Sequence, residues 1–166
     1  MAIMQRCCCF SNVRSGSMAC GIYSLITSCI YLAVWSWNLA QYVKIFAAYA
    51  DAGLTVTGAD GIYAAYSIDI IVAVFLLIAS IVLLVGVSQD NGTMLIPYMV
   101  AIMALMVLQA IAWVILFVLL GVASVVLIVN LVFWLLFTAL NITCLICVIS
   151  QYQELREGRG KASDLV

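Results

Sequence analysis

The chain has 166 residues, of which 68% are hydrophobic and only 8% are charged, and its formal net charge is −1. An ordinary soluble domain is about half apolar and a quarter charged, so this composition excludes one and predicts a membrane protein. The near-neutral charge gives no sign of nucleic-acid binding. With no His and only seven carboxylates, the chain is poor in acid–base and metal-ligating groups, so we expect neither an enzyme nor a bound metal or cofactor.

A polar N-terminal arm is predicted over residues 1–16, before the first apolar run. It contains three adjacent cysteines: Cys7, Cys8 and Cys9. Thiols next to a membrane span are accessible to membrane-bound acyltransferases, and attached chains would fix the arm to the bilayer, so we favour S-acylation. A metal site and the lack of any role are the alternatives; without His, the triplet lacks the ligand spacing of a zinc site.

The first span is predicted over residues 17–37, because its Trp35-Ser36-Trp37 ending suits the membrane–water interface, which indole side chains favour. Four small residues recur in it at intervals of four, three and four: Ser17, Gly21, Ser24 and Ser28. These intervals place them on one helical face, where small side chains let a helix of this chain or of a partner approach closely. A chance pattern in a Ser-rich span is the alternative.

An outer loop is predicted over residues 38–67, the longest hydrophilic connection in the chain. Three charged residues, three glycines and four tyrosines lie in it, so we expect an irregular segment close to the membrane surface. Continuation of the first helix through Tyr49 is the alternative for its first part.

The second span is predicted over residues 68–87, and Asp69 near its outer end is the only acidic residue close to the hydrocarbon. A carboxylate inside a membrane is by default a candidate functional group, here for a channel or transporter subunit. Hydration at the interface, or a helix-capping role, is the alternative.

Residues 94–150 form an uncharged run that, as a single helix, would reach about 86 Å, whereas the hydrocarbon core measures roughly 30 Å. The run must therefore fold back, and the small residues around Gly121 mark the corner between spans at 94–119 and 125–150. Three amides in these spans are candidates for hydrogen bonds between helices: Gln109, Asn130 and Asn141. The predicted fold is all-α, a bundle of four transmembrane helices.

The basic residues predict the orientation of this bundle. Five of the six lie in the two terminal segments, and only Lys44 lies in a loop. Four spans put both termini on one side, which the positive-inside rule identifies as the cytosol. The cysteines avoid the outer loop, so no disulfide framework is expected. The glycosylation sequence Asn91-Gly92-Thr93 then faces the cytosol, and we expect it to remain unmodified.

The C-terminal tail is predicted over residues 151–166 and contains two short motifs. Tyr152 and Leu155 have the spacing of a tyrosine-based sorting signal, a pattern that also occurs often by chance. Asp164 and the terminal Val166 suit capture of a C-terminal carboxylate by strand addition in a PDZ-type scaffold; a frayed tail without a partner is the alternative.

Several motifs on the predicted cytosolic side resemble the lysosome-associated transmembrane (LAPTM) proteins. The arm sequence CCCFSNVRSGS at 7–17 is similar to the cysteine-rich V-R-[ST]-G-[ST] segment before their first span. The GVS at 86–88 followed by LIPY at 95–98 resembles their link between spans two and three, and CLIC at 144–147 is a looser match. Those proteins also have a long luminal loop and a proline-rich tail that recruits ubiquitin ligases; neither is found here, so ligase recruitment is not carried over.

In size and plan the chain is closer to small arthropod tetraspans of the pasiflora type, which help to assemble and deliver septate-junction components in epithelia and glia. This resemblance implies a non-enzymatic protein that organises, assembles or traffics partner membrane proteins at junctional plasma membrane, with an endosomal and secretory pool. An endolysosomal sorting adaptor and a small channel or transporter subunit are the alternatives. The expected partners are membrane lipids, other membrane proteins, a PDZ-type scaffold and further copies of the chain.

Overall fold

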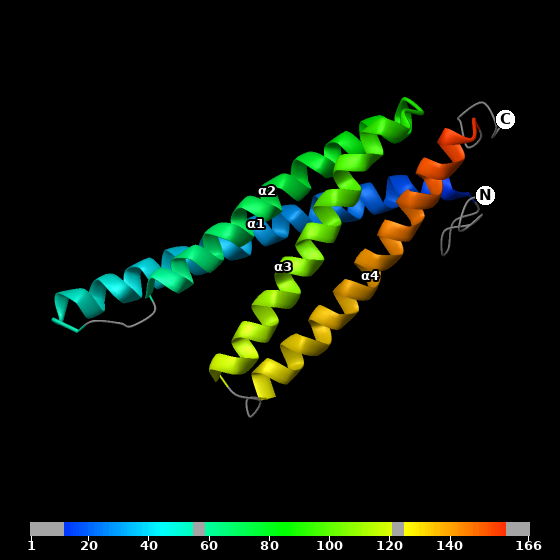
Figure 1. Cartoon of the computed structure of the whole chain (residues 1–166). Coiled ribbons are helices and arrows are strands. Elements are labelled where there is room, and N and C mark those ends of the chain that lie inside the picture. The colour runs from blue at the N-terminus through cyan, green and yellow to red at the C-terminus, as the bar shows by residue number, and fades with distance from the viewer. Residues whose placement is uncertain (1–11, 55–58, 121–124, 159–166) are drawn as a thin grey trace.

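The computed structural model describes residues 12–54, 59–120 and 125–158. Within these ranges the chain is helical and has no strand (Figure 1). The elements are α1 (Val13–Asp51), α2 (Ala59–Ser88), the 3-10 helix η1 (Gly92–Leu95), α3 (Ile96–Leu120) and α4 (Val125–Arg156). All four α-helices contain a stretch long and apolar enough to cross a membrane. The prediction of an all-α membrane protein with four spans is confirmed.

The predicted outer loop at 38–67 is wrong, because helices occupy most of it, and the alternative that the first helix continues through Tyr49 is confirmed. No Gly or Pro lies between Asn38 and Ala52, so nothing in that stretch interrupts α1. The helix ends only where Gly53 adopts a positive φ of 71°. There the Leu54 N–H donates to the Tyr49 carbonyl at 2.9 Å and the Gly53 N–H to the Ala50 carbonyl at 3.0 Å, the bonding pattern of a Schellman motif.

The predicted ends of the membrane domain are also displaced. The helix α1 begins at Val13, inside the predicted arm, because the Asn12 side chain accepts a hydrogen bond from the Ser15 N–H at 2.8 Å and caps it. The helix α4 continues through the first six residues of the predicted tail and stops at Arg156, just before Gly158 with its φ of 76°. The third span starts with η1 rather than as one continuous α-helix.

Among the side chains that the structure describes, the hydrophobic core lies at one end of the bundle, the end where α1 begins and α4 ends. We call this the inner end and the opposite one the outer end. Buried apolar side chains run from Val13 to Cys20 in α1, from Ala73 to Val87 in α2, from Leu95 in η1 to Leu105 in α3 and from Cys144 to Val148 in α4. The pair α1–α2 and the pair α3–α4 diverge toward the outer end, as Figure 1 shows.

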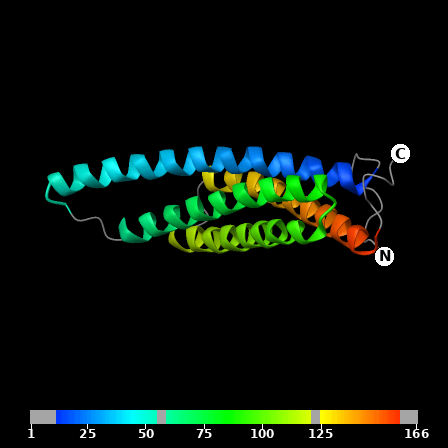
Figure 2. The ribbon, with the colours of Figure 1, turned by 90° about the horizontal axis from the view of Figure 1, so that it is seen from above.

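The four helices differ in length: α1 has 39 residues, α4 has 32, α2 has 30 and α3 has 25. With 39 residues, α1 measures about 58 Å, more than the roughly 40–45 Å of a bilayer including its headgroups. The helix α3 has 25 residues and measures about 38 Å, which matches the bilayer. Figure 2 shows α1 and α2 reaching farther than α3 and α4 at the outer end. We call residues 38–51 of α1 and 59–67 of α2 the outer extension.

Candidate functional site

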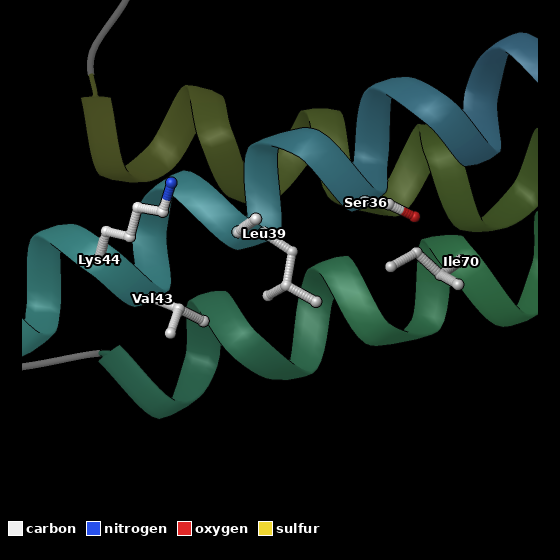
Figure 3. Close-up of a pocket in the computed structure, with 6 residues that line it drawn as sticks. Ser36, Leu39, Val43, Lys44 and Ile70 are labelled. Carbon is white, nitrogen blue, oxygen red and sulfur yellow. The ribbon is translucent and has the colours of Figure 1, made fainter.

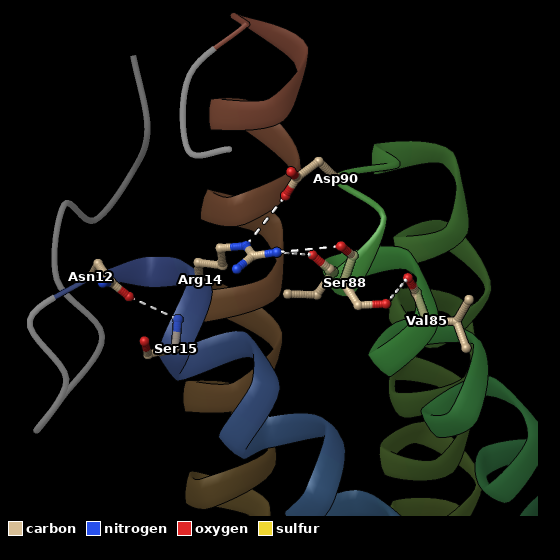
Figure 4. Close-up of polar contacts among 7 residues, drawn as sticks. Asn12, Arg14, Ser15, Val85, Ser88 and Asp90 are labelled. Atoms are coloured by element: carbon tan, nitrogen blue, oxygen red, sulfur yellow. Dashed lines mark hydrogen bonds and ion pairs between the residues drawn. The ribbon is translucent and has the colours of Figure 1, made fainter. Parts of the chain in front are cut away.

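A polar cluster at the inner end is centred on Arg14, in the first turn of α1 (Figure 4). Its Nε donates to Asp90 Oδ1 at 3.2 Å, forming an ion pair with both side chains 22% exposed. Its Nη2 donates to the Val87 carbonyl at 3.0 Å and to the Ser88 carbonyl at 3.4 Å. These carbonyls end α2 and have no partner within the helix, so the Arg14 cation caps α2 from α1.

Asp90 holds the turn between α2 and η1 in an unusual conformation. Its φ of 53° lies in the left-handed region, which a helix ending of this kind normally fills with Gly. The Asn91 N–H donates to the Gly86 carbonyl at 2.9 Å and closes the turn. A non-glycine residue in this conformation costs about 1 kcal/mol, and here the ion pair with Arg14 offsets the cost.

Substitutions in this pair should separate the two roles of Arg14. We expect Arg14→Gln to lower the free energy of unfolding by about 1–2 kcal/mol, because it removes both the ion pair and the cap on two α2 carbonyls. Asp90→Asn should cost less than about 1 kcal/mol, since a partly exposed pair is weak and Asn tolerates the left-handed region. Thermal unfolding of the detergent-solubilised protein measures both, with exposed Arg156→Gln as the control. Equal losses for Arg14→Gln and Asp90→Asn would contradict the capping role.

The small face predicted in the first span lies inside the bundle. Ser17, Ser24 and Ser28 are fully or nearly fully buried. The Ser24 hydroxyl is 2.7 Å from the Tyr98 hydroxyl of α3, and Ser17 Oγ is 3.5 Å from the Cys147 carbonyl of α4. Gly21 faces Leu84 of α2 closely. Helices of the same chain therefore cover this face. The prediction that a helix of a partner protein packs against it is wrong.

The sorting-signal candidates lie in the last turns of α4 rather than in an unstructured tail. Tyr152 and Leu155 are partly buried and pack against the core. A Cβ on Gly92 would lie 3.4 Å from Tyr152 Cδ2 and 3.7 Å from Leu155 Cβ, so both residues contact η1. The sorting signal stays a prediction, and a receptor could read it only after the end of α4 had been released from η1.

The predicted intramembrane polar residues lie at different depths. Gln109 is half-buried near the middle of α3 and lies near Tyr31 of α1. Asn141 is buried in the middle of α4, whereas Asp69 is half-buried toward the outer end of α2. The structure places Asp69 nearer the interface than the other two. The side chain of Asn130 lies outside the described residues.

The remaining predicted sites lie outside the described residues. They are the S-acylation candidates Cys7, Cys8 and Cys9 and the scaffold-binding candidates Asp164 and Val166. Among the described cysteines, Cys20, Cys29 and Cys144 keep their thiols, whereas Cys147 is disulfide-bonded. No disulfide framework was expected, because all seven cysteines lie in the predicted arm or in predicted spans, and the bond at Cys147 departs from that expectation.

A ladder of aromatic rings, which sequence reasoning missed, starts at Tyr31 and Trp35 of α1 and continues along the outer extension. Neighbouring rings contact each other in the order Tyr31, Trp35, Tyr66, Tyr42, Phe46 and Tyr63. The centroid distances between α1 and α2 are 5.8 Å for Trp35–Tyr66, 5.3 Å for Tyr42–Tyr66 and 5.4 Å for Phe46–Tyr63. Such pairs favour these separations and stabilise by about 0.5–1.5 kcal/mol each, so the ladder joins α1 to α2 beyond the core. The spacing of four between Tyr31 and Trp35, and again between Tyr42 and Phe46, was the available signal.

Exposed apolar side chains continue along the outer extension and just beyond it. The exposed fraction is 48% for Val43, 46% for Ile45, 45% for Tyr49 and 57% for Leu54. Tyr49 lies about 48 Å along α1 from Ser17, where the first span is predicted to begin, and this distance exceeds the roughly 30 Å of a hydrocarbon core. Apolar groups on a surface that lipid tails do not cover are typical of an interaction site.

Comparison with known proteins matches the chain to one family. The family model, described as a domain of unknown function (DUF4728), matches residues 70–156, just over half of the 166 residues. The match starts within α2 and ends at the last residue of α4, so it includes Asp90, Tyr98 and most of the core. No curated protein and no solved structure matches the chain. The chain belongs to the DUF4728 family.

Proposed function

We propose that this protein is a non-enzymatic tetraspan that organises, assembles or traffics partner membrane proteins, and that it acts at cell–cell junctions of the plasma membrane. The observation that carries the proposal is the apolar surface of the outer extension. The junctional location and the septate-junction role are supported by the resemblance to the pasiflora-type tetraspans.

The outer extension suits contact with another protein because it is both apolar and held in place. An exposed apolar side chain within the hydrocarbon needs no partner, since lipid tails surround it. Val43, Ile45 and Tyr49 lie farther along α1 than the hydrocarbon reaches, so burying them against a protein would be favourable by about 25 cal/mol per Å² of apolar surface. The ring ladder holds α1 against α2 and limits the entropy lost on binding.

Site-specific photocrosslinking in epithelial cells tests this proposal. A benzophenone amino acid at Tyr49, which is 45% exposed on the outer extension, should form adducts with other membrane proteins. The matched control places the same group at Val107, which is 59% exposed in the bilayer-length part of α3 and should contact mainly lipid. Protein adducts that are absent at Tyr49, or equally abundant at Val107, would contradict the proposal.

Proximity labelling from a tagged C-terminus then identifies the compartment. Enrichment of junction components over lysosomal membrane proteins is expected. The reverse enrichment would favour the endolysosomal adaptor, which the resemblance to the LAPTM proteins supports. In that case a Tyr152→Ala variant that still unfolds at the wild-type temperature should move from lysosomes to the cell surface.

A further inference from the structure

We propose that Cys147 of α4 is bonded to one of the three arm cysteines, and that oxidation and reduction of this disulfide attach the N-terminal arm to α4 and release it. The arm cysteines are Cys7, Cys8 and Cys9. The chain has seven cysteines, and those that keep their thiols in the described helices are Cys20, Cys29 and Cys144. Cys147 is disulfide-bonded, and a bond within one chain needs a second sulfur. By elimination, that sulfur belongs to an arm cysteine.

The sulfur of Cys147 lies beside the first turn of α1, where the arm joins the bundle. Its Sγ is 3.8 Å from the Val13 carbonyl oxygen and 3.9 Å from Ser17 Oγ. Cys9 precedes Val13 by four residues and Cys7 by six, so an extended chain from Val13 reaches about 14 Å and about 22 Å. A disulfide places the two Cα atoms about 5.5–6 Å apart. Each arm cysteine can therefore meet Cys147 without any movement of the described helices.

The bond lies at the end of the bundle that the basic residues predict to face the cytosol. Five of the six basic residues are in the terminal segments. The sixth, Lys44, lines an open depression between α1 and α2 on the outer extension, at the opposite end (Figure 3). Disulfides that face the cytosol are usually transient and serve catalysis or redox sensing, because glutathione and thioredoxin keep cytosolic thiols reduced. This location favours a bond that forms and breaks over a permanent one.

Hydrogen peroxide and a small thiol such as glutathione can drive the two directions of this reaction. Peroxide oxidises the thiolate of the arm cysteine to a sulfenic acid, which condenses with the Cys147 thiol and loses water. The two thiols thus give up two electrons and two protons, and the peroxide becomes two water molecules. Two glutathione molecules reverse the change and become a disulfide themselves. The Cys147 side chain is 0% exposed, so a reductant must attack the sulfur of the arm cysteine.

The bond also limits S-acylation of the arm. An acyl chain forms a thioester with a free thiol, so a cysteine that is bonded to Cys147 cannot carry one. Oxidation therefore leaves at most two of the three arm cysteines for acylation, whereas reduction restores the third. Neither reaction involves a partner membrane protein, so the redox control and the proposed function can fail separately.

Thiol counting on the purified full-length protein tests the bond. The protein is treated with hydrogen peroxide, its free thiols are blocked with N-ethylmaleimide in SDS, and the thiols that reduction then releases are labelled with polyethylene-glycol maleimide. We expect two labels per chain after peroxide, and none when reduced glutathione follows the peroxide. Trypsin cuts after Arg6 and Arg14, so residues 7–14 of the oxidised protein should stay attached to the fragment 45–156 until the bond is reduced.

Three variants show which sulfurs form the bond. Cys147→Ser should lose both labels, and so should the combined variant with serine at all three arm positions. The combined variant changes no residue of the described helices, so it tests the bond even if Cys147→Ser fails to fold. Cys144→Ser, one turn away in α4, should keep both labels. Circular dichroism establishes that each variant is folded.

Four results would overturn the inference. They are the absence of labels in the wild type, wild-type labelling of the combined arm variant, a disulfide-linked dimer in place of the bond within one chain, and a bond that glutathione leaves intact.

Discussion

Replacing Gly86 by alanine is expected to destabilise the protein by about 1–3 kcal/mol, although alanine is the better helix former. A Cβ at this position would lie 2.6 Å from Met94 Cβ, 3.2 Å from Leu95 Cδ1 and 3.3 Å from the Asn91 carbonyl oxygen. A Cβ and a backbone oxygen cannot rotate away as the end of a flexible side chain can. Accommodating the new methyl would therefore displace η1 and the start of α3 from α2.

Two other glycines provide graded controls for Gly86→Ala. Nothing lies within 4 Å of a Cβ at Gly61 on the exposed start of α2, so Gly61→Ala should stabilise by up to about 1 kcal/mol. At Gly21 the nearest atom, 2.7 Å away, is Leu84 Cδ2, the end of a flexible side chain, so Gly21→Ala should fall between the two. Reversible unfolding in mixed micelles of increasing SDS content measures all three. If Gly86→Ala unfolds at the same SDS fraction as Gly61→Ala, the contact with Met94 does not limit the packing.

The glycines also show which features of the fold the sequence could predict and which it could not. Long apolar runs predicted the number of spans, because hydropathy reports which residues can face lipid. Hydropathy does not report where a helix stops, and this is why residues 38–67 were predicted as a loop. Gly53 and Gly61 look alike in the sequence, yet only Gly53 adopts a positive φ and ends a helix, whereas Gly61 lies within α2.

Contacts between residues far apart in the sequence are the second feature that the sequence could not predict. The spacing of Ser17, Gly21, Ser24 and Ser28 singled out the face of α1 that is buried. It could not identify the helices that bury this face, because periodicity within one helix carries no information about its neighbours. The pairing of Arg14 with Asp90 joins residues 76 positions apart and depends on how α1 meets the turn after α2. Such pairs became visible only in the structure.

The hydrogen bond between Ser24 and Tyr98 leads to the second prediction, in which the two partners respond unequally. Tyr98 is fully buried, and its hydroxyl is 2.7 Å from Ser24 Oγ. Tyr98→Phe should cost only about 0.6 kcal/mol, the typical value of such a bond in a membrane. The remaining Ser24 hydroxyl can turn to a backbone carbonyl of its own helix, as Ser80 does to Leu76 at 2.7 Å and Thr27 to Tyr23 at 2.8 Å.

Ser24→Ala should cost about 1–3 kcal/mol, because it leaves the buried Tyr98 hydroxyl without a hydrogen-bond partner. The ring of Tyr98 is rigid, so this hydroxyl cannot turn to a backbone carbonyl as a serine hydroxyl can. Adding Tyr98→Phe to Ser24→Ala removes that phenol and should restore stability to nearly that of Tyr98→Phe alone. Tyr98→Ala should be the most damaging of the set, at about 3–5 kcal/mol, since it opens a cavity where α1 and α3 meet. The same SDS unfolding assay measures these values in a double-mutant cycle. If the two single substitutions cost the same and simply add, the hydroxyls do not depend on each other, and α1 and α3 are joined by packing alone.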